Sequence, residues 1–390
     1  MPTIHSGTVT TADVNSTSLG IDCSKAVAML NPNQTLIYSI LNILGKKAPA
    51  EAVKVEWDED EHLPFKTTVN GAIAAGATSL VVDDGTIFKV NDVIRNMRTT
   101  ENMLITAIST HTLTVVRAYG TVSAAAVNDE DNIFRIGNVN EEGGDVLAAK
   151  VTQRSSVYNL TQIFKHDVDI AGTMLSQVMR SGESYKSYQE KKIAVDHALD
   201  IERGILFGQL KNDTANFTDV ARQMRGIYHT ISTNVRADGN GTLTLAEWNS
   251  FLEDLGAANG SGDRLSGKIV LIGSIISQAL AAWGLDKAQV NMEAKKYGMH
   301  ITEYMTPGGA KFMLKHHQLF KESSELKGMA MVIDPEQLWL RPLKNRDTKY
   351  HANLPTTADK YLGEYRTELS LEMRLEKNFA LLTGITGYSV

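Results

Sequence analysis

The segment EYRTELSLEMRLE, residues 364–376, alternates between two kinds of side chain. Its odd positions are Tyr, Thr, Leu, Leu, Met and Leu, whereas its even positions are Glu, Arg, Glu, Ser, Glu, Arg and Glu. A period of two predicts a β-strand with one face buried and the other exposed and charged. Strands usually have about five or six residues, so this longer one indicates an elongated sheet.

A long helix is predicted over residues 184–210, SYKSYQEKKIAVDHALDIERGILFGQL. At about 100° per residue, one arc of about 120° collects Val195, Ala198, Leu199, Ile205 and Leu206. This apolar stripe predicts a helix that packs along one side only. Glu202 falls inside the stripe, so we expect it either at the edge of the stripe or paired with a cation.

The N-terminal region predicts an arm followed by a short helix. Residues 1–25 are too polar to form a core, and residues 31–47, NPNQTLIYSILNILGKK, have a helix pattern that stops at Gly45. Residues 52–64, AVKVEWDEDEHLP, then predict a strand that leads into an acidic loop.

Residues 67–138 predict a small all-β module, which looks inserted because the flanking sequence differs in character. Five β-type runs recur at a spacing of roughly ten residues: 79–82, 92–95, 102–109, 112–117 and 132–136. Residues 220–345 mix strands and helices, with a strand at 269–272, a helix capped by Ser274 and a hairpin at 300–317. The fold class expected for the whole chain is therefore α+β.

Composition excludes several classes of protein. The chain has 390 residues, 43% hydrophobic and 22% charged, which favours two or three folded units. A net charge of −6 argues against bulk nucleic-acid binding. Cys23 is the single cysteine and nothing resembles a secretion signal, so a reducing cytosolic compartment is expected. The most apolar stretch, 269–285, is too short and polar for a membrane span.

Two motifs resemble ligand sites but fit poorly. Residues 262–268 spell GxxxxGK, yet the next residue is Ile269, and the loop precedes a strand instead of following one. Residues 238–247 match positions three to twelve of a calcium loop, but Arg236 stands where the first ligand belongs. Thr244 and Glu247 fit a helix-capping box better.

Other candidate sites are weaker. The acidic residues 58–61 with His62 point in alternate directions, and the adjacent His316 and His317 cannot share a metal on one strand face. Neither GxSxG nor HExxH is present. We therefore predict no catalytic, cofactor-binding or metal-binding residues, no cofactor, and no enzymatic activity, although a triad assembled from distant residues stays open.

The order of these segments resembles the tailed-bacteriophage major capsid proteins of the Hong Kong 97 type, most closely the branch with a β-module inserted in the extended loop. The similar pieces are the arm with NPNQTLIYSIL, VEWDEDEHLP at 55–64, AVDHALDIERGILFG at 194–208 and the terminal ELSLEMRLEKNFALLTGITG. The resemblance implies an N-terminal arm (1–50), an extended loop (51–66 and 139–175) and an inserted β domain (67–138). It also implies a peripheral domain with a long spine helix and long β-sheet (176–219 and 346–390), and an axial α/β domain (220–345).

That resemblance implies self-assembly into pentamers and hexamers of an icosahedral head shell around double-stranded DNA. The partners would be neighbouring subunits, reached through the arm and the extended loop, with portal, scaffolding or decoration proteins besides. Contact with packaged DNA would be non-specific and no membrane would be involved. The location would be the virion head, assembled in the host bacterial cytoplasm. The alternatives are a phage tail-tube or baseplate protein and, from another class, a metal-dependent enzyme using the acidic loop or residues 238–247.

Overall fold

The computed structural model of the chain describes residues 35–143, 149–177, 184–237, 240–259, 266–287, 295–296, 299–300 and 302–389. The expected arm at 1–25 and Cys23 lie outside these residues. The chain divides into two compact units, one spanning Asp58–Ser156 and the other formed by the chain up to Trp57 and from Val157 onward.

The long strand predicted at 364–376 is confirmed as β22, Lys360–Met373. One edge pairs antiparallel with β9, Gln162–Ala171, over ten residues. The other edge pairs with β21, Lys349–His351, and β20, Leu338–Pro342. The predicted exposed face is wrong, because Glu364, Glu368 and Glu372 are all buried.

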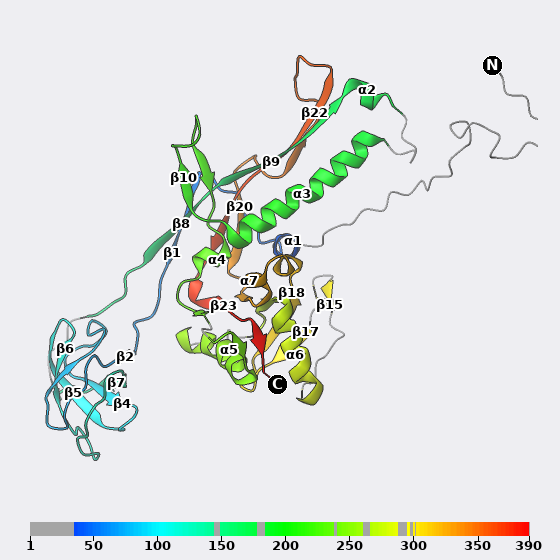
Figure 1. The fold of residues 1–390 in the computed structure, drawn as a ribbon. Coiled ribbons are helices and arrows are strands. Elements are labelled where there is room, and N and C mark those ends of the chain that lie inside the picture. The colour runs from blue at the N-terminus through cyan, green and yellow to red at the C-terminus, as the bar shows by residue number, and fades with distance from the viewer. Residues whose placement is uncertain are drawn as a thin grey trace, which may run out of the picture. The chain divides into compact units, whose positions relative to one another are not determined.

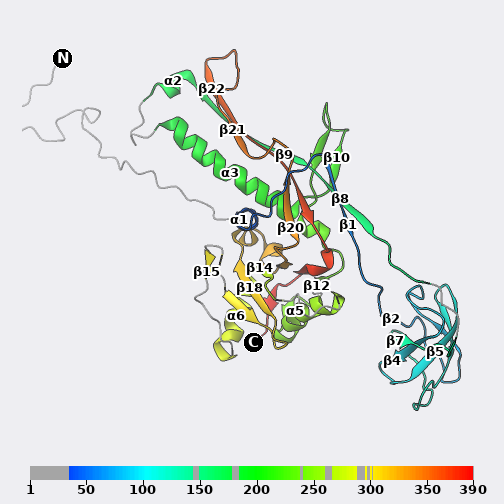
Figure 2. The same cartoon turned by 180° about the vertical axis from the view of Figure 1, so that it is seen from behind.

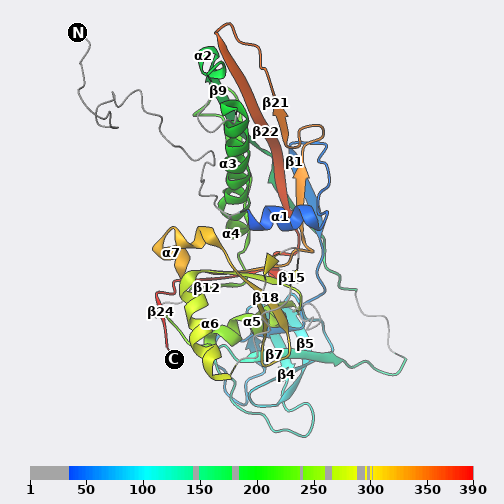
Figure 3. The same cartoon turned by 90° about the vertical axis from the view of Figure 1, so that its right-hand side faces the viewer.

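The predicted long helix is α3, Tyr185–Phe207, which runs beside β9 and β22 (Figures 1 and 3). The expected stripe is confirmed in its C-terminal half, where Leu199, Ile205 and Leu206 are buried, whereas Val195 and Ala198 are half-buried. Phe164 of β9 reaches Gly204, where a β-carbon would lie 2.8 Å from its ring. A glycine here lets the helix approach the sheet closely.

A second sheet of six strands has the order β12-β23-β19-β14-β18-β17. Residues of β14 alternate between two hydrophobic clusters, Ile269 and Leu271 in one and Val270 and Ile272 in the other. The second cluster includes Trp248 of α5, Leu245–Asn259, and Ile276 of α6, Ser274–Lys287. Both faces of this sheet are therefore packed, as its continuous apolar strands require. Its strands are β12 Val235–Ala237, β14 Ile269–Ile272, β17 Thr302–Met305, β18 Lys311–His316, β19 Ala330–Ile333 and β23 Ala380–Thr383.

The unit Asp58–Ser156 contains an antiparallel sheet of order β2-β7-β4-β5-β6-β3, with its own cluster around Phe88, Ile94, Met103 and Ile105. All five β-type runs of the sequence lie in its strands. These are β2 Lys66–Thr68, β3 Ser79–Val81, β4 Asp92–Asn96, β5 Asn102–Ser109, β6 Thr112–Val116 and β7 Asn132–Asn138. Two ion pairs support the turns of this unit: Arg117 with the buried Glu101, and Arg98 with Asp131.

Short elements complete the fold (Figures 1 and 2). The predicted short helix is α1, Leu36–Ile43, and Gly45 follows it with φ +66°. Strand β1, Lys54–Glu59, pairs with β8, Ser155–Leu160. None of the helices in the described residues is long and apolar enough to span a membrane. The rest are α2 Gly172–Leu175, β10 Lys211–Asp213, β11 Ala221–Gln223, α4 Ile227–Thr230, β13 Thr242–Leu243, β15 Lys295–Lys296, β16 Met299–His300, η2 Gln318–Lys321, α7 Ser324–Lys327, η3 Glu376–Asn378 and β24 Gly387–Tyr388.

Candidate functional site

The side chain of Glu202 joins α3 to the N-terminus of α1. Its two carboxylate oxygens accept hydrogen bonds from the backbone N–H groups of Ile37 and Tyr38, each at 2.8 Å. N–H groups in the first turn of a helix have no partner within the helix, and Thr35 supplies no side-chain cap. A negative charge at this end also interacts favourably with the positive end of the helix dipole. Glu202 therefore caps α1, although it lies 165 positions after Ile37 in the sequence.

His317 supports the same carboxylate from a third segment. Its Nδ1 accepts a hydrogen bond from the N–H of Leu319, so the ring proton lies on Nε2, which faces Glu202 at 3.2 Å. Both side chains are buried. Glu202 therefore does not lie at an exposed edge of the stripe. Two backbone N–H groups and the ring of His317 hold its carboxylate.

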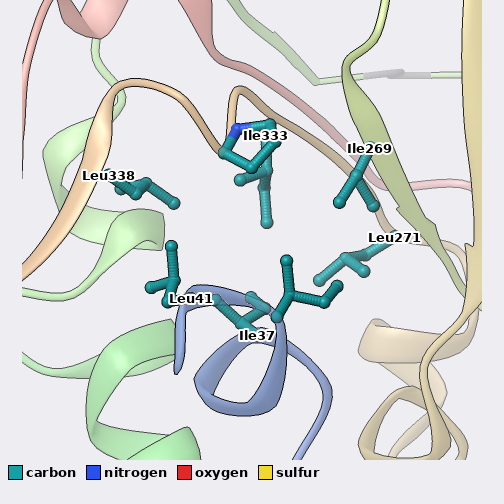
Figure 4. Close-up of a pocket in the computed structure, with 8 residues that line it drawn as sticks. Ile37, Leu41, Ile269, Leu271, Ile333 and Leu338 are labelled. Atoms are coloured by element: carbon teal, nitrogen blue, oxygen red, sulfur yellow. The ribbon is translucent and has the colours of Figure 1, made fainter. Parts of the chain in front are cut away.

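The apolar face of α1 completes this contact. Ile37 and Leu41 face Ile269, Leu271 and Ile333 across a small apolar cavity, with Leu338 also lining it (Figure 4). The cavity has only hydrocarbon walls at these positions and offers no polar group to orient a ligand. We regard it as a packing feature of the α1 contact.

A chain of polar side chains crosses the interface between α3 and the long sheet. His166 of β9 meets His197 of α3 with their Nδ1 atoms 3.1 Å apart, and His197 Nε2 lies 2.7 Å from the hydroxyl of Thr367. Burial, together with the neighbouring His166, lowers the pKa of His197 to about 4. The ring of His197 is therefore neutral at neutral pH, as a position between a helix and a sheet requires.

The opposite face of β22 carries a row of buried carboxylates, which we call the charged row: Glu364, Glu368 and Glu372 with their basic partners. Thr367 contacts α3, so the even-numbered glutamates point away from that helix. Each carboxylate is in close contact with one arginine, at 2.5 or 2.6 Å; the pairs are Arg366 with Glu364, Arg346 with Glu368, and Arg374 with Glu372. Hydrogen bonding to Arg366 lowers the pKa of Glu364 below its ordinary value.

The motifs weighed in the sequence have other roles here. Lys268 of the GxxxxGK segment is buried and donates to the carbonyl of Asn378, whereas residues 262–265 lie outside the described residues. Glu247 accepts hydrogen bonds from the N–H and hydroxyl of Thr244, which confirms the capping box. Asp238 of the calcium-like loop lies outside the described part.

The remaining candidates do not converge on an ion. The exposed Asp58 and Asp60 accept hydrogen bonds from the hydroxyls of Ser156 and Thr152. His317 is committed to Glu202, and His316 precedes it at the end of β18. In the part of the chain that the structure describes, no three His, Cys, Asp or Glu residues are grouped to hold a metal.

One unit of the chain has a long helix on a long antiparallel strand and a six-stranded sheet, and the other is a small β unit. Both units fall within the match to a known protein family. The profile of the SU10 major capsid protein family matches residues 5–386. The chain belongs to the SU10 major capsid protein family. A curated relative in this functional class, the major capsid protein of Pseudomonas phage PaMx41, is 25% identical over 289 residues, which cover 72% of this chain and 68% of the relative. The function is that of a phage major capsid protein, as the sequence predicted.

Solved capsid structures share the fold of this family member. The capsid of a native GTA particle matches with a TM-score of 0.50 and 10% identity, covering 96% of this chain and 97% of the other. The Cyanophage A-1(L) capsid also has a TM-score of 0.50 and 10% identity, with coverage of 95% and 98%. The fold is therefore that of phage capsid proteins, the Hong Kong 97-like fold, built from mixed α and β elements.

The sequence did not reveal which groups contact the Glu202 carboxylate at the start of α1. It placed Glu202 in an apolar stripe, and that conflict was the available signal, since a buried carboxylate needs hydrogen-bond donors. Nothing in the pattern identified Ile37, Tyr38 and His317 as those donors. The charged row was missed because alternation alone does not distinguish an exposed charged face from a buried, paired one.

Proposed function

We propose that copies of this chain assemble as pentamers and hexamers into the icosahedral head shell of a tailed phage, enclosing double-stranded DNA. The chain would have no catalytic role and hold no cofactor or metal. It would reach the virion head after assembly in the host bacterial cytoplasm, with neighbouring subunits as its main partners. Portal, scaffolding or decoration proteins would be further partners, and contact with DNA would be non-specific.

The observation that carries this proposal is the unburied N-terminal half of the long helix. α3 has 23 residues, or about 35 Å, and β22 has 14 residues, or about 46 Å. The buried side chains of α3 all lie between His197 and Leu206, whereas none of residues 185–196 is buried and Lys191 and Lys192 are exposed. A half-helix that buries no side chain within one subunit gains most from covering by neighbours, which is the geometry of a repeating shell.

The domain boundaries belong to the same proposal. We assign residues 1–50 to an N-terminal arm, 51–66 and 139–175 to the extended loop, and 67–138 to a β domain inserted in that loop. Residues 176–219 and 346–390 would form the peripheral domain and 220–345 the axial domain. The separate hydrophobic cluster of the unit Asp58–Ser156 supports an insertion. The pairing of β9 with β22 would join the end of the extended loop to the peripheral sheet.

Electron microscopy of the purified protein, or of particles that contain it, tests the proposal. We expect closed shells or rings of five and six subunits. Helical tubes would favour the tail-tube alternative. A protein that stays monomeric at high concentration, with no shell or ring under any assembly condition, would contradict both.

A further inference from the structure

His166 and His197 make a contact that only one arrangement of protons satisfies. The hydroxyl of Thr367 donates a hydrogen bond to the hydroxyl of Thr348 at 2.8 Å, so it accepts one from the Nε2–H of His197. The Nδ1 of His197 therefore carries a lone pair, which accepts a hydrogen bond from the Nδ1–H of His166 at 3.1 Å. The two rings are bonded only while His197 is neutral.

The other nitrogen of His166 faces Asp200 of α3. Its Nε2 lies 3.2 Å from Oδ2 of Asp200, and a carboxylate can only accept hydrogen bonds. With an acceptor at each nitrogen, the ring of His166 holds two protons and a positive charge in this arrangement. A proton added to His197 would place two N–H donors 3.1 Å apart, each on a charged ring and with no acceptor between them.

The surroundings of His197 oppose the charge that such a proton would bring. His197 is 2% exposed, and burial together with the charge of His166 outweighs the opposite effect of Asp200. Hydrogen bonds, ion pairs and ring contacts on this side of the interface join the following titratable or charged groups: Lys186, Glu190, Asp200 and Arg203 of α3, His166 of β9, Tyr350 of β21, and Tyr361 and Tyr365 of β22.

The packing of α3 differs on the two sides of His197. Towards the C-terminus, Leu199, Ile205 and Leu206 are buried. Towards the N-terminus, residues 185–196 include no buried side chain, and their apolar contact with the sheet is made by half-buried residues such as Ile193. Detaching the N-terminal part therefore exposes much less apolar surface than detaching the rest. A detached helix of this length is marginal in water, so its backbone hydrogen bonds would open as well.

We propose that the contact between His166 and His197, which we call the histidine latch, is an acid-operated device. When His197 takes up a proton, residues 185–197 separate from β9 and β22, while the C-terminal half of α3 stays packed. A fall in pH thus loosens one end of the long helix without unfolding the subunit. This inference goes beyond the proposed shell function, and it is tested on subunits that are not assembled.

The direction and the pH range follow from the two states of His197. In the detached segment its pKa has the ordinary value of 6.5, whereas in the closed contact it is about 4. The open state therefore binds the proton more tightly. The equilibrium constant for opening rises about tenfold for each pH unit as the pH falls from about 6.5 to about 4. Above this range neither state is protonated and below it both are, so the constant levels off at both ends.

Hydrogen exchange of full-length, unassembled subunits tests the latch. After correction for the intrinsic rate, we expect amide protection in residues 185–197 to fall about 100-fold between pH of about 6.5 and 4.5, while protection in β14 and β19 stays constant. His197→Gln can still donate to Thr367 but cannot titrate, so protection of the same segment should change less than about threefold. His229→Gln changes an exposed histidine of α4 outside the latch and should keep the wild-type profile.

His166→Gln provides a second test if His197→Gln does not fold. Without the charged ring of His166, the pKa of His197 is lowered mainly by burial, so protection should fall by a smaller factor and level off at a higher pH than in wild type. A wild-type segment whose protection does not depend on pH would overturn the latch. So would a folded His197→Gln variant that follows the wild-type profile. Equal loss of protection in the segment, β14 and β19 would mean that acid unfolds the whole unit, which also overturns it.

Discussion

Glu202 shows how one residue can connect three segments of the chain. Its carboxylate caps α1, extends from α3 and contacts His317, which follows β18. A hydrogen bond to a charged group contributes more than a neutral one, and an unpaired buried donor costs the full desolvation penalty. The direction in which the chain enters α1 thus depends on a side chain far away in sequence.

Glu202→Gln keeps the shape of this side chain but removes its charge and one of its two acceptor oxygens. We expect the free energy of unfolding to fall by about 2 kcal/mol, because one backbone N–H of α1 would lose its acceptor. Urea unfolding of unassembled subunits, followed by circular dichroism, measures the change. Asp196→Asn, on the same helix but outside this contact, should change it by less than about 0.5 kcal/mol. Equal effects of the two substitutions would refute the capping role.

Asp131 predicts a pH dependence in the β unit. A hydrogen bond from Arg98, supported by Asn96 and the N–H of Asn128, lowers the pKa of Asp131 from 3.8 to about 2 against the opposing effect of burial. A carboxyl group whose pKa is lowered on folding stabilises the native state fully above its unfolded pKa. That contribution is lost as the pH falls from about 4 to about 2.

Hydrogen exchange measures this effect within the unit. In wild type, protection of the amides in β4 and β7 should fall as the pH drops from 5 to 2, after correction for the intrinsic exchange rate. Asp131→Asn should start with lower protection and lose less of it over the same range. A variant with the pH profile of wild type would show that another group is responsible.

At the scale of elements, the end of α3 depends on a close approach between two backbone segments. Gly208 ends the helix, and its carbonyl accepts a hydrogen bond from the N–H of Gly226 just before α4. A β-carbon at Gly208 would lie 2.4 Å from the carbonyl oxygen of Met224. Backbone atoms cannot rotate away as a side chain can, so the two segments would have to separate.

Gly208→Ala should therefore lower the free energy of unfolding by about 2 kcal/mol, the range for overpacked sites. Its φ of −55° is allowed for alanine, so the loss would come from the contact and not from backbone strain. Chemical denaturation provides the measurement. Gly387→Ala, where a β-carbon would meet nothing within 4 Å, is the matched control. If both variants are as stable as wild type, the segments are more adaptable than their contact implies.

At the scale of the whole molecule, the two compact units have separate hydrophobic clusters that share no residue. The chain leaves one unit after Trp57 in β1 and returns at Val157 in the paired strand β8. Because these strands are neighbours, a short linker can join them. Removal of a separate unit of this kind is tolerated when few contacts depend on it.

Replacing residues 58–156 by a short Gly-Ser linker should leave the other unit folded. All four tryptophans, Trp57, Trp248, Trp283 and Trp339, remain. We therefore expect a near-UV circular dichroism spectrum with native tryptophan bands, and cooperative thermal unfolding. A variant that loses these bands while keeping far-UV signal would show that the unit Asp58–Ser156 is needed for packing elsewhere.

Local patterns are enough to predict the longer elements, because periodicity, capping residues and turn residues act over a few neighbouring positions. They located β22, α3, α1 and the strands of the β unit, and Thr244 with Glu247 marked the start of α5. What covers each face of these elements is seen only in the folded chain. Glu368 is buried with Arg346 and Arg222, and Glu202 caps α1, through contacts between residues far apart in the chain. A local pattern specifies which way a side chain points, but its partner depends on how distant segments pack.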